Sequence, residues 1–128
     1  MIIRLLKHLL GTARDVRGPG WQSRRFLLAE DNMGFTLNDT LIEAGAELEL
    51  TYHHHLEACY CIEGAGDITD HATGKTHPIA PGTLYALDNH DHHTVRAFDH
   101  GLRLISVFNP PLSGAEVHRE DGSYAPPA

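Results

Sequence analysis

Histidines are the residues of this sequence whose number and spacing most favour chemistry. There are 11 of them among 128 residues. Three are consecutive, at positions 53–55, and a second cluster holds His90, His92 and His93. Imidazole binds transition metals and titrates near neutral pH, so these clusters indicate a metal site or an acid–base site.

Glu57 and Tyr85 lie in two segments with a recognisable spacing. Six residues separate Glu57 from Gly64, and Pro81-Gly82 precedes Tyr85 by two intervening residues. This spacing resembles the two conserved motifs of the cupin superfamily, which bind one metal through three histidines and a glutamate. Here Tyr85 occupies the second-motif histidine position, and the first-motif histidine pair is not cleanly present. The resemblance is therefore one of spacing, with different ligand types.

The departure from the usual cupin ligands, together with motifs along the whole chain, resembles the ectoine synthase family. The order and spacing of the motifs carry the resemblance, and no single motif does. The matching segments are Gly20-Trp21 with Ser23 and Arg25, Met33-Gly34-Phe35, His55-Leu56-Glu57-Ala58, Pro81-Gly82 with Tyr85-Ala86-Leu87-Asp88, His90-Asp91 with His93, Val107-Phe108-Asn109-Pro110-Pro111, and Gly114 with Glu116-Val117-His118.

This resemblance implies an enzyme, a hydro-lyase, that closes N-gamma-acetyl-L-2,4-diaminobutyrate into the compatible solute ectoine with loss of water. Fold alone does not fix function. The alternatives are another metal-dependent cupin enzyme and a cupin that binds a small molecule without turnover.

The resemblance also implies a metal centre, with ferrous iron held by Glu57, Tyr85 and His93. Ligand chemistry alone would permit iron, zinc or manganese for an oxygen-rich set with one imidazole. Glu57 could instead be a strand-end carboxylate in water, and Tyr85 an aromatic side chain of the barrel wall. His93 is favoured over His90 and His92.

A substrate pocket is the third implication of the resemblance. Arg25 could hold the substrate carboxylate through a bidentate fork, and Glu116 could attract the ammonium group. The alternatives are that Trp21 only covers the barrel mouth, that Arg25 forms a surface ion pair, and that Glu116 and His118 are solvated in a loose tail. The implied substrate-contacting residues are Trp21, Arg25, Asn38, Thr40, Tyr52, Phe108, Glu116 and His118.

Ring closure also needs a group that takes a proton from the substrate amine. Tyr52 and His118 are the candidate bases, Glu116 completes the implied catalytic set, and the sequence does not choose among them. Strict strand alternation would place Tyr52 and Glu57 on opposite faces. A bulge or bend near residues 53–55 would bring both into one barrel.

Short strands separated by turn residues must position these side chains. In the stretch 35–42, apolar residues alternate with Thr36, Asn38 and Thr40. The pattern leaves open whether this polar face is solvated or lines an interior pocket. Further strands are predicted at 47–52, 56–62, from 68, and at 83–87, 94–98 and 102–108. A helix is predicted around 22–29.

The sequence thus predicts an all-β fold, a small cupin-type antiparallel barrel (jelly-roll) with a short N-terminal helix, in a single domain over residues 1–128. The net charge of −7 disfavours a nucleic-acid partner. Residues 1–10 are too short and too charged to span a membrane, so we expect a cytoplasmic protein with free thiols at Cys59 and Cys61. A homodimer is expected because small cupins commonly cover their sheet edges by association.

Overall fold

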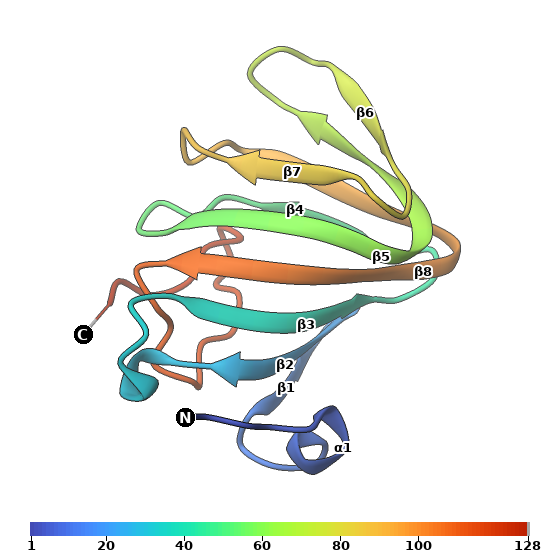
Figure 1. Cartoon of the computed structure of the whole chain (residues 1–128). Coiled ribbons are helices and arrows are strands. Elements are labelled where there is room, and N and C mark those ends of the chain that lie inside the picture. The colour runs from blue at the N-terminus through green and yellow to red at the C-terminus, as the bar shows by residue number, and fades with distance from the viewer. Residues whose placement is uncertain (128) are drawn as a thin grey trace.

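Antiparallel strands in two facing layers form the frame of the chain (Figure 1). The computed structural model describes residues 1–127. One layer has the order β1-β2-β3-β8-β5-β7, and the other has β4-β8-β5-β6. The elements are α1 (Leu6–Leu9), β1 (Asp15–Gly18), β2 (Trp21–Leu27), the 3₁₀ turn η1 (Ala29–Asp31), β3 (Thr36–Ile42), β4 (Glu47–Leu50), β5 (Leu56–Asp70), β6 (Thr76–Ile79), β7 (Leu84–Leu87) and β8 (His93–Asn109). The predicted all-β fold is confirmed.

β5 and β8 join the two layers because both strands bend and continue from one layer into the other. The first half of β5 pairs with the second half of β8, and the reverse holds beyond the bend. Gly64 lies at this bend with φ +86°, and a Cβ placed on it would lie 1.9 Å from the carbonyl oxygen of Gly101. Only glycine permits this approach. The prediction of separate shorter strands was wrong here, since the glycines bend the strands without ending them.

The bend also shifts the burial pattern of β8. Buried positions are odd-numbered from His93 to Ala97 and even-numbered from Leu102 to Phe108. Strict alternation would turn one of these halves outward. The alternation is interrupted at residues 98–101, so the buried side chains of both halves of β8 point into the barrel.

The predicted helix around 22–29 is wrong, because these residues form most of β2. This strand pairs with both β1 and β3. Arg24 of β2 can be buried because its guanidinium pairs with the carboxylate of Asp39 in β3 at 2.6 Å. The short N-terminal helix is α1, and the segment around it is tied down by Arg4 and Arg14, which both pair with Asp31.

The polar face of β3 points into the barrel. Thr36 and Asn38 are almost fully buried, whereas Leu37 and Leu41 on the other face are partly exposed. The interior is therefore mixed, with polar side chains from β3 beside apolar ones such as Leu104 and Val95. Cys59 and Cys61 are buried free thiols on the same face of β5. Within residues 1–127, none of the helices is long and apolar enough to cross a membrane.

Candidate metal and substrate site

Most of the predicted site residues line one cavity inside the barrel, and Arg25, His93 and Glu116 do not. The walls of this cavity come from β2, β3, β4, β5, β7 and β8 and from the segment after β8. The predicted residues in its walls are Trp21, Asn38, Thr40, Tyr52, Glu57, Tyr85, Phe108 and His118.

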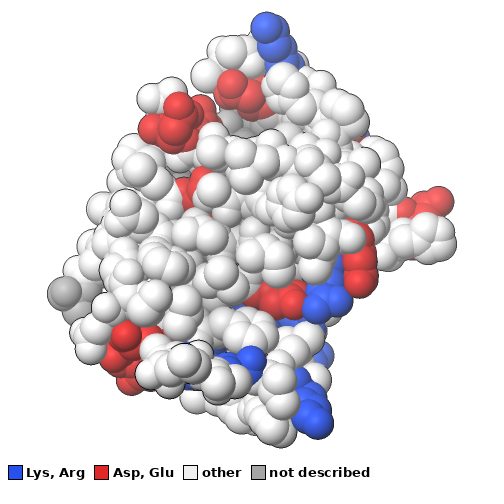
Figure 2. Space-filling view, in the orientation of Figure 1, with Lys and Arg blue, Asp and Glu red and all other residues white. Residues whose placement is uncertain are grey.

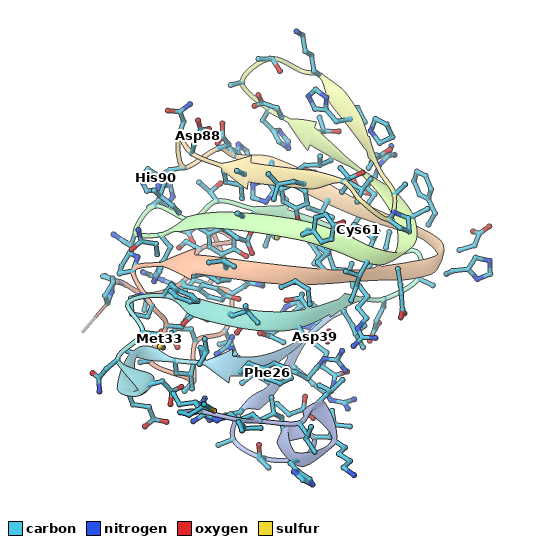
Figure 3. All side chains as sticks on the ribbon, viewed as in Figure 1. Phe26, Met33, Asp39, Cys61, Asp88 and His90 are labelled. Carbon is cyan, nitrogen blue, oxygen red and sulfur yellow. The ribbon has the colours of Figure 1, made fainter. Side chains whose placement is uncertain are left out.

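A bend at His53 and His54 removes the conflict between Tyr52 and Glu57. Tyr52 lies in the connection after β4 and Glu57 in β5, and both side chains are buried in the same cavity. His90, in the loop after β7 (Figure 3), holds this connection in place. Its Nδ1–H donates to the carbonyl oxygens of Tyr52 at 2.7 Å and His55 at 3.1 Å. His53 and His54 themselves are exposed.

Glu57 and Tyr85 enter the cavity from neighbouring strands. Glu57 lies opposite Leu87 and Tyr85 opposite Cys59 in the β5–β7 ladder, which places both side chains on one face. Burial raises the pKa of the Glu57 carboxyl to about 7 and raises the pKa of the Tyr85 phenol well above its usual range. Among residues 1–127, no cation contributes to the pKa of either group, so nothing there compensates for their burial.

His93 reaches the same region from the first residue of β8. Its Nδ1–H donates to the carbonyl oxygen of Asp91 at 2.8 Å, which fixes the ring. Its Nε2 is buried without a hydrogen-bond partner. Tyr85 borders both the main cavity and an adjoining one that His93 lines.

These three donors fit a divalent metal ion. A bound cation would favour the charged forms of the buried carboxyl and the buried phenol. It would also give the imidazole nitrogen the partner that it lacks. The neighbouring histidines fit less well, since His90 is bonded to backbone and His92 points outward. His55 also has buried ring nitrogens without a hydrogen-bond partner, so His93 as the third ligand stays a prediction.

Tyr52 and His118 form a hydrogen-bonded pair at the cavity wall. The Tyr52 hydroxyl lies 2.7 Å from Nε2 of His118. Burial lowers the pKa of His118 to about 4, helped by the positive charge of Arg25, so the ring is neutral at neutral pH. A neutral imidazole can accept a proton from a hydroxyl that is itself in contact with substrate.

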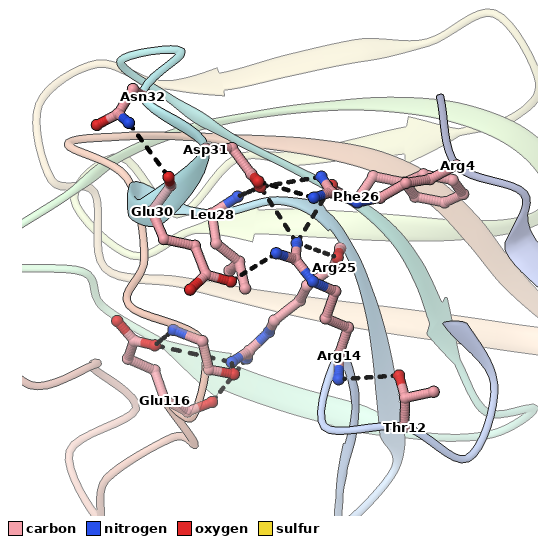
Figure 4. Close-up of polar contacts among 11 residues, drawn as sticks. Arg4, Thr12, Arg14, Arg25, Phe26, Leu28, Glu30, Asp31, Asn32 and Glu116 are labelled. Atoms are coloured by element: carbon pink, nitrogen blue, oxygen red, sulfur yellow. Dashed lines mark hydrogen bonds and ion pairs between the residues drawn. The ribbon is translucent and has the colours of Figure 1, made fainter. Parts of the chain in front are cut away.

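Arg25 and Glu116 lie behind the cavity and do not line it. The fully buried Arg25 guanidinium donates to the carbonyl oxygens of Gly114 at 2.8 Å and Glu116 at 2.6 Å (Figure 4). The Glu116 carboxylate accepts from the backbone N–H groups of Ser113 and Gly114 and lies 3.8 Å from Arg25. Both residues therefore hold the segment after β8 against the barrel. Their direct contact with substrate stays a prediction.

Tyr124 lines the cavity, and the sequence did not predict it there. Its ring stacks on His118 with centroids 4.7 Å apart and packs against Tyr52 at 5.0 Å. Only 3% of Tyr124 is exposed, although it stands among Gly, Ser and Pro residues. A large aromatic residue in so polar a tail was the available signal, because such a residue gains most from packing. Cys59 and Ser106, 3.4 Å apart at the cavity floor, were also missed.

Comparison with known proteins gives this arrangement a family. The family model described as ectoine synthase matches residues 1–128. An L-ectoine synthase from Desulfosudis oleivorans is 53% identical over 124 residues, covering 97% of this chain and 96% of that protein. The chain belongs to the ectoine synthase family. The crystal structure of ectoine synthase from P. lautus agrees, with 52% identity, a TM-score of 0.88, and coverage of 95% of this chain and 87% of that one.

More distant structures confirm the cupin fold. A cupin 2 conserved barrel domain protein from Salinispora arenicola has a TM-score of 0.68 at 19% identity, covering 84% of this chain and 87% of that one. At that identity the similarity concerns the fold alone. The predicted family, the cupin barrel and the assignment as an enzyme of the ectoine synthase family are thus confirmed.

Proposed function

We propose that residues 1–128 act as one catalytic domain that converts N-gamma-acetyl-L-2,4-diaminobutyrate into ectoine by loss of water. The observation that carries the proposal is the buried cavity that joins Glu57 and Tyr85 to the Tyr52–His118 pair, in a member of the ectoine synthase family. Donors for a cation and a proton acceptor therefore border the same cavity. Ring closure needs both of these functions.

Glu57, Tyr85 and His93 are proposed to hold ferrous iron. Two oxygen donors and one imidazole suit a first-row divalent ion. Such an ion supplies a Lewis acid for the acetamide oxygen of the substrate. The role of the chain is to hold the ligands: the Asp91 carbonyl fixes the His93 ring, and the β5–β7 ladder fixes Glu57 beside Tyr85.

The cavity walls are proposed to fold the substrate so that its amine nitrogen meets its acetamide carbon. Because binding already holds the two reacting atoms together, the chemical step itself loses little entropy, and its barrier is lower. Asn38 is suited to bind the amide, because its Oδ1 is buried without a partner. Phe108 and Trp21 supply apolar walls. Arg25 does not line this cavity, and it is proposed to act on the reaction by holding the segment that carries His118.

His118 is proposed as the base, with Tyr52 as the group that passes the proton to it. The substrate amine loses a proton before its nitrogen bonds to the acetamide carbon. Burial raises the pKa of the Tyr52 phenol, so Tyr52 is a poor base by itself. When its hydroxyl donates to the neutral His118 ring, its oxygen can accept the amine proton as its own proton moves on. The same pair can return protons to the departing oxygen, which leaves as water.

The activity is tested with metal-depleted protein, N-gamma-acetyl-L-2,4-diaminobutyrate and ferrous iron added back without oxygen, followed by chromatography. We expect ectoine to form only after iron is restored, in proportion to the bound metal. If folded, iron-loaded protein formed no ectoine, the proposal would be rejected in favour of another cupin activity or a binding role.

The order of the proton path is tested with His118→Asn and Tyr52→Phe. We expect each change to lower turnover by about 10²–10⁴-fold, the usual contribution of a positioned acid–base group. In iron-loaded protein, where the bound ion would keep Glu57 ionised, the pKa of about 4 of His118 predicts that activity persists as the pH falls below 6.5 and declines only toward 4. The decline should vanish in His118→Asn. The exposed His8→Asn serves as the control, and an unchanged pH profile in His118→Asn would exclude His118 as the base.

The protein is also proposed to act as a cytoplasmic homodimer. Figure 2 shows a broad face over β5, β7 and β8 with little charge. Leu56, Tyr60 and Leu84 are exposed on these strands, at 39%, 47% and 63%. Association over such a face would cover apolar side chains of both copies.

A further inference from the structure

Two histidines and a glutamate meet on the outer surface of the second layer, away from the cavity. They are Glu49, His71 and His92, and all three are exposed. One ring nitrogen of each histidine and one carboxylate oxygen all lie within 4.8 Å of one another. In the described part of the chain, this is the one group of three or more His, Cys, Asp or Glu residues with such a spacing. It shares no residue with the proposed iron ligands.

The backbone brings these side chains together from three separate segments. Glu49 lies in β4 opposite Thr94 of β8, and Asp70 of β5 lies opposite His93. The next residue, His71, continues this ladder, since its N–H donates to the carbonyl oxygen of His92 at 3.0 Å. The positions are thus fixed by sheet hydrogen bonds and do not depend on a flexible loop.

The side chains are already oriented toward one another. The His71 and His92 rings are stacked, with centroids 4.0 Å apart and planes 9° apart. Nε2 of His92 lies 2.6 Å from Oε1 of Glu49, and Nε2 of His71 lies 2.7 Å from the Thr94 hydroxyl. The Thr94 hydroxyl is the kind of contact that orients a metal-binding imidazole, whereas the Glu49 contact already joins two of the three candidate ligands.

We propose that Glu49, His71 and His92 form a second metal site that takes a divalent ion of the zinc class. Two imidazoles and one carboxylate are typical zinc donors, with bonds of about 2.0–2.2 Å and ligand atoms about 3.3 Å apart in a tetrahedron. Side-chain rotations bring the three atoms from their present spacing to that geometry, and the exposed rings have room to make them. Water takes the fourth position.

This site is independent of the proposed iron centre even though His92 and His93 are adjacent. His92 immediately precedes β8 and is exposed, whereas His93, the first residue of β8, is buried. An ion on the outside would connect β4, the end of β5 and the start of β8. Because the folded chain alone presents the three ligands together, binding should stabilise it in proportion to ion concentration.

The test titrates the full-length protein with zinc chloride and counts bound ions by equilibrium dialysis. The wild type is compared with His71→Ala and Glu49→Gln, and His100→Ala provides an exposed-histidine control from the bend of β8. We expect the wild type and His100→Ala to bind one ion more than His71→Ala, whose affinity for the outer ion falls at least about tenfold. Glu49→Gln should weaken binding in the same direction. Zinc should raise the melting temperature of the wild type more than that of His71→Ala.

Zinc-soaked crystals of the wild type give an answer that does not depend on any variant. An anomalous-difference peak between Glu49, His71 and His92 would support the site. A peak at the inner ligands alone, or equal stoichiometry and affinity for zinc in the wild type and a folded His71→Ala, would overturn it.

Discussion

Replacing Glu57 with Gln is expected to remove bound iron and turnover together. Gln has the same shape but offers a neutral amide, so the proposed site loses its charged oxygen donor. Turnover should fall at least about a thousandfold, because a Lewis acid lowers the activation barrier by several kcal/mol and each 1.4 kcal/mol changes the rate about tenfold. Iron content and ectoine formation, measured on the same preparation, should fall in parallel.

The Glu57→Gln variant should still fold, which keeps the result interpretable. Burial raises the pKa of Glu57 to about 7, so its charge gains little from the surrounding protein, and a neutral side chain fits the same space. A matched control is Glu63→Gln in the same strand, where the carboxylate is 66% exposed and pairs with Arg103 on the surface. Wild-type turnover in Glu57→Gln, or turnover by metal-free wild type, would refute the proposed metal role.

Replacing Arg25 with Met is expected to release the segment after β8 from the barrel. The change removes the bonds to Gly114 and Glu116 and leaves the Glu116 carboxylate, 10% exposed, without its cation. Removing one partner of a buried charge pair typically costs about 3–5 kcal/mol. Urea denaturation should show a loss of this size, and amide exchange should rise across residues 112–124.

Arg17→Met is the matched control for Arg25→Met. Arg17 is exposed in the neighbouring strand β1, so its replacement should change the free energy of unfolding by no more than about 0.5 kcal/mol. Because the released segment carries His118 and Tyr124, Arg25→Met should also lose activity. If its stability and amide exchange matched those of Arg17→Met, Arg25 would have no part in holding the segment.

Local patterns in the sequence were sufficient for the strands that alternate cleanly. The alternation at 35–42 predicted β3 and its two faces, and the structure shows that Thr36 and Asn38 point inward. β2 was not predictable in this way. Its Arg24 and Arg25 are buried only because Asp39 and the carbonyl groups of the distant C-terminal segment compensate them, and contacts of that kind leave no local signature.

The site shows the same division between local pattern and long-range contact. Glu57 and Tyr85 were predictable because they belong to motifs with a fixed spacing. For His118, the local sequence favoured a solvated tail residue, whereas packing against Trp21 at 4.8 Å and Tyr124 at 4.7 Å places it in the cavity. The importance of Tyr124 follows from that packing, which exists only once the segment after β8 has folded back over the barrel.

The burial shift within β8 limits which changes of length the chain can accept. The strand carries His93 near one end and Phe108 near the other, and both face inward only because residues 98–101 absorb one step of the alternation. Inserting or deleting one residue between His93 and the bend would turn one of these side chains toward solvent, while a change of two would restore its direction. Relatives of this chain should therefore tolerate substitution in β8 much more readily than a single-residue insertion or deletion.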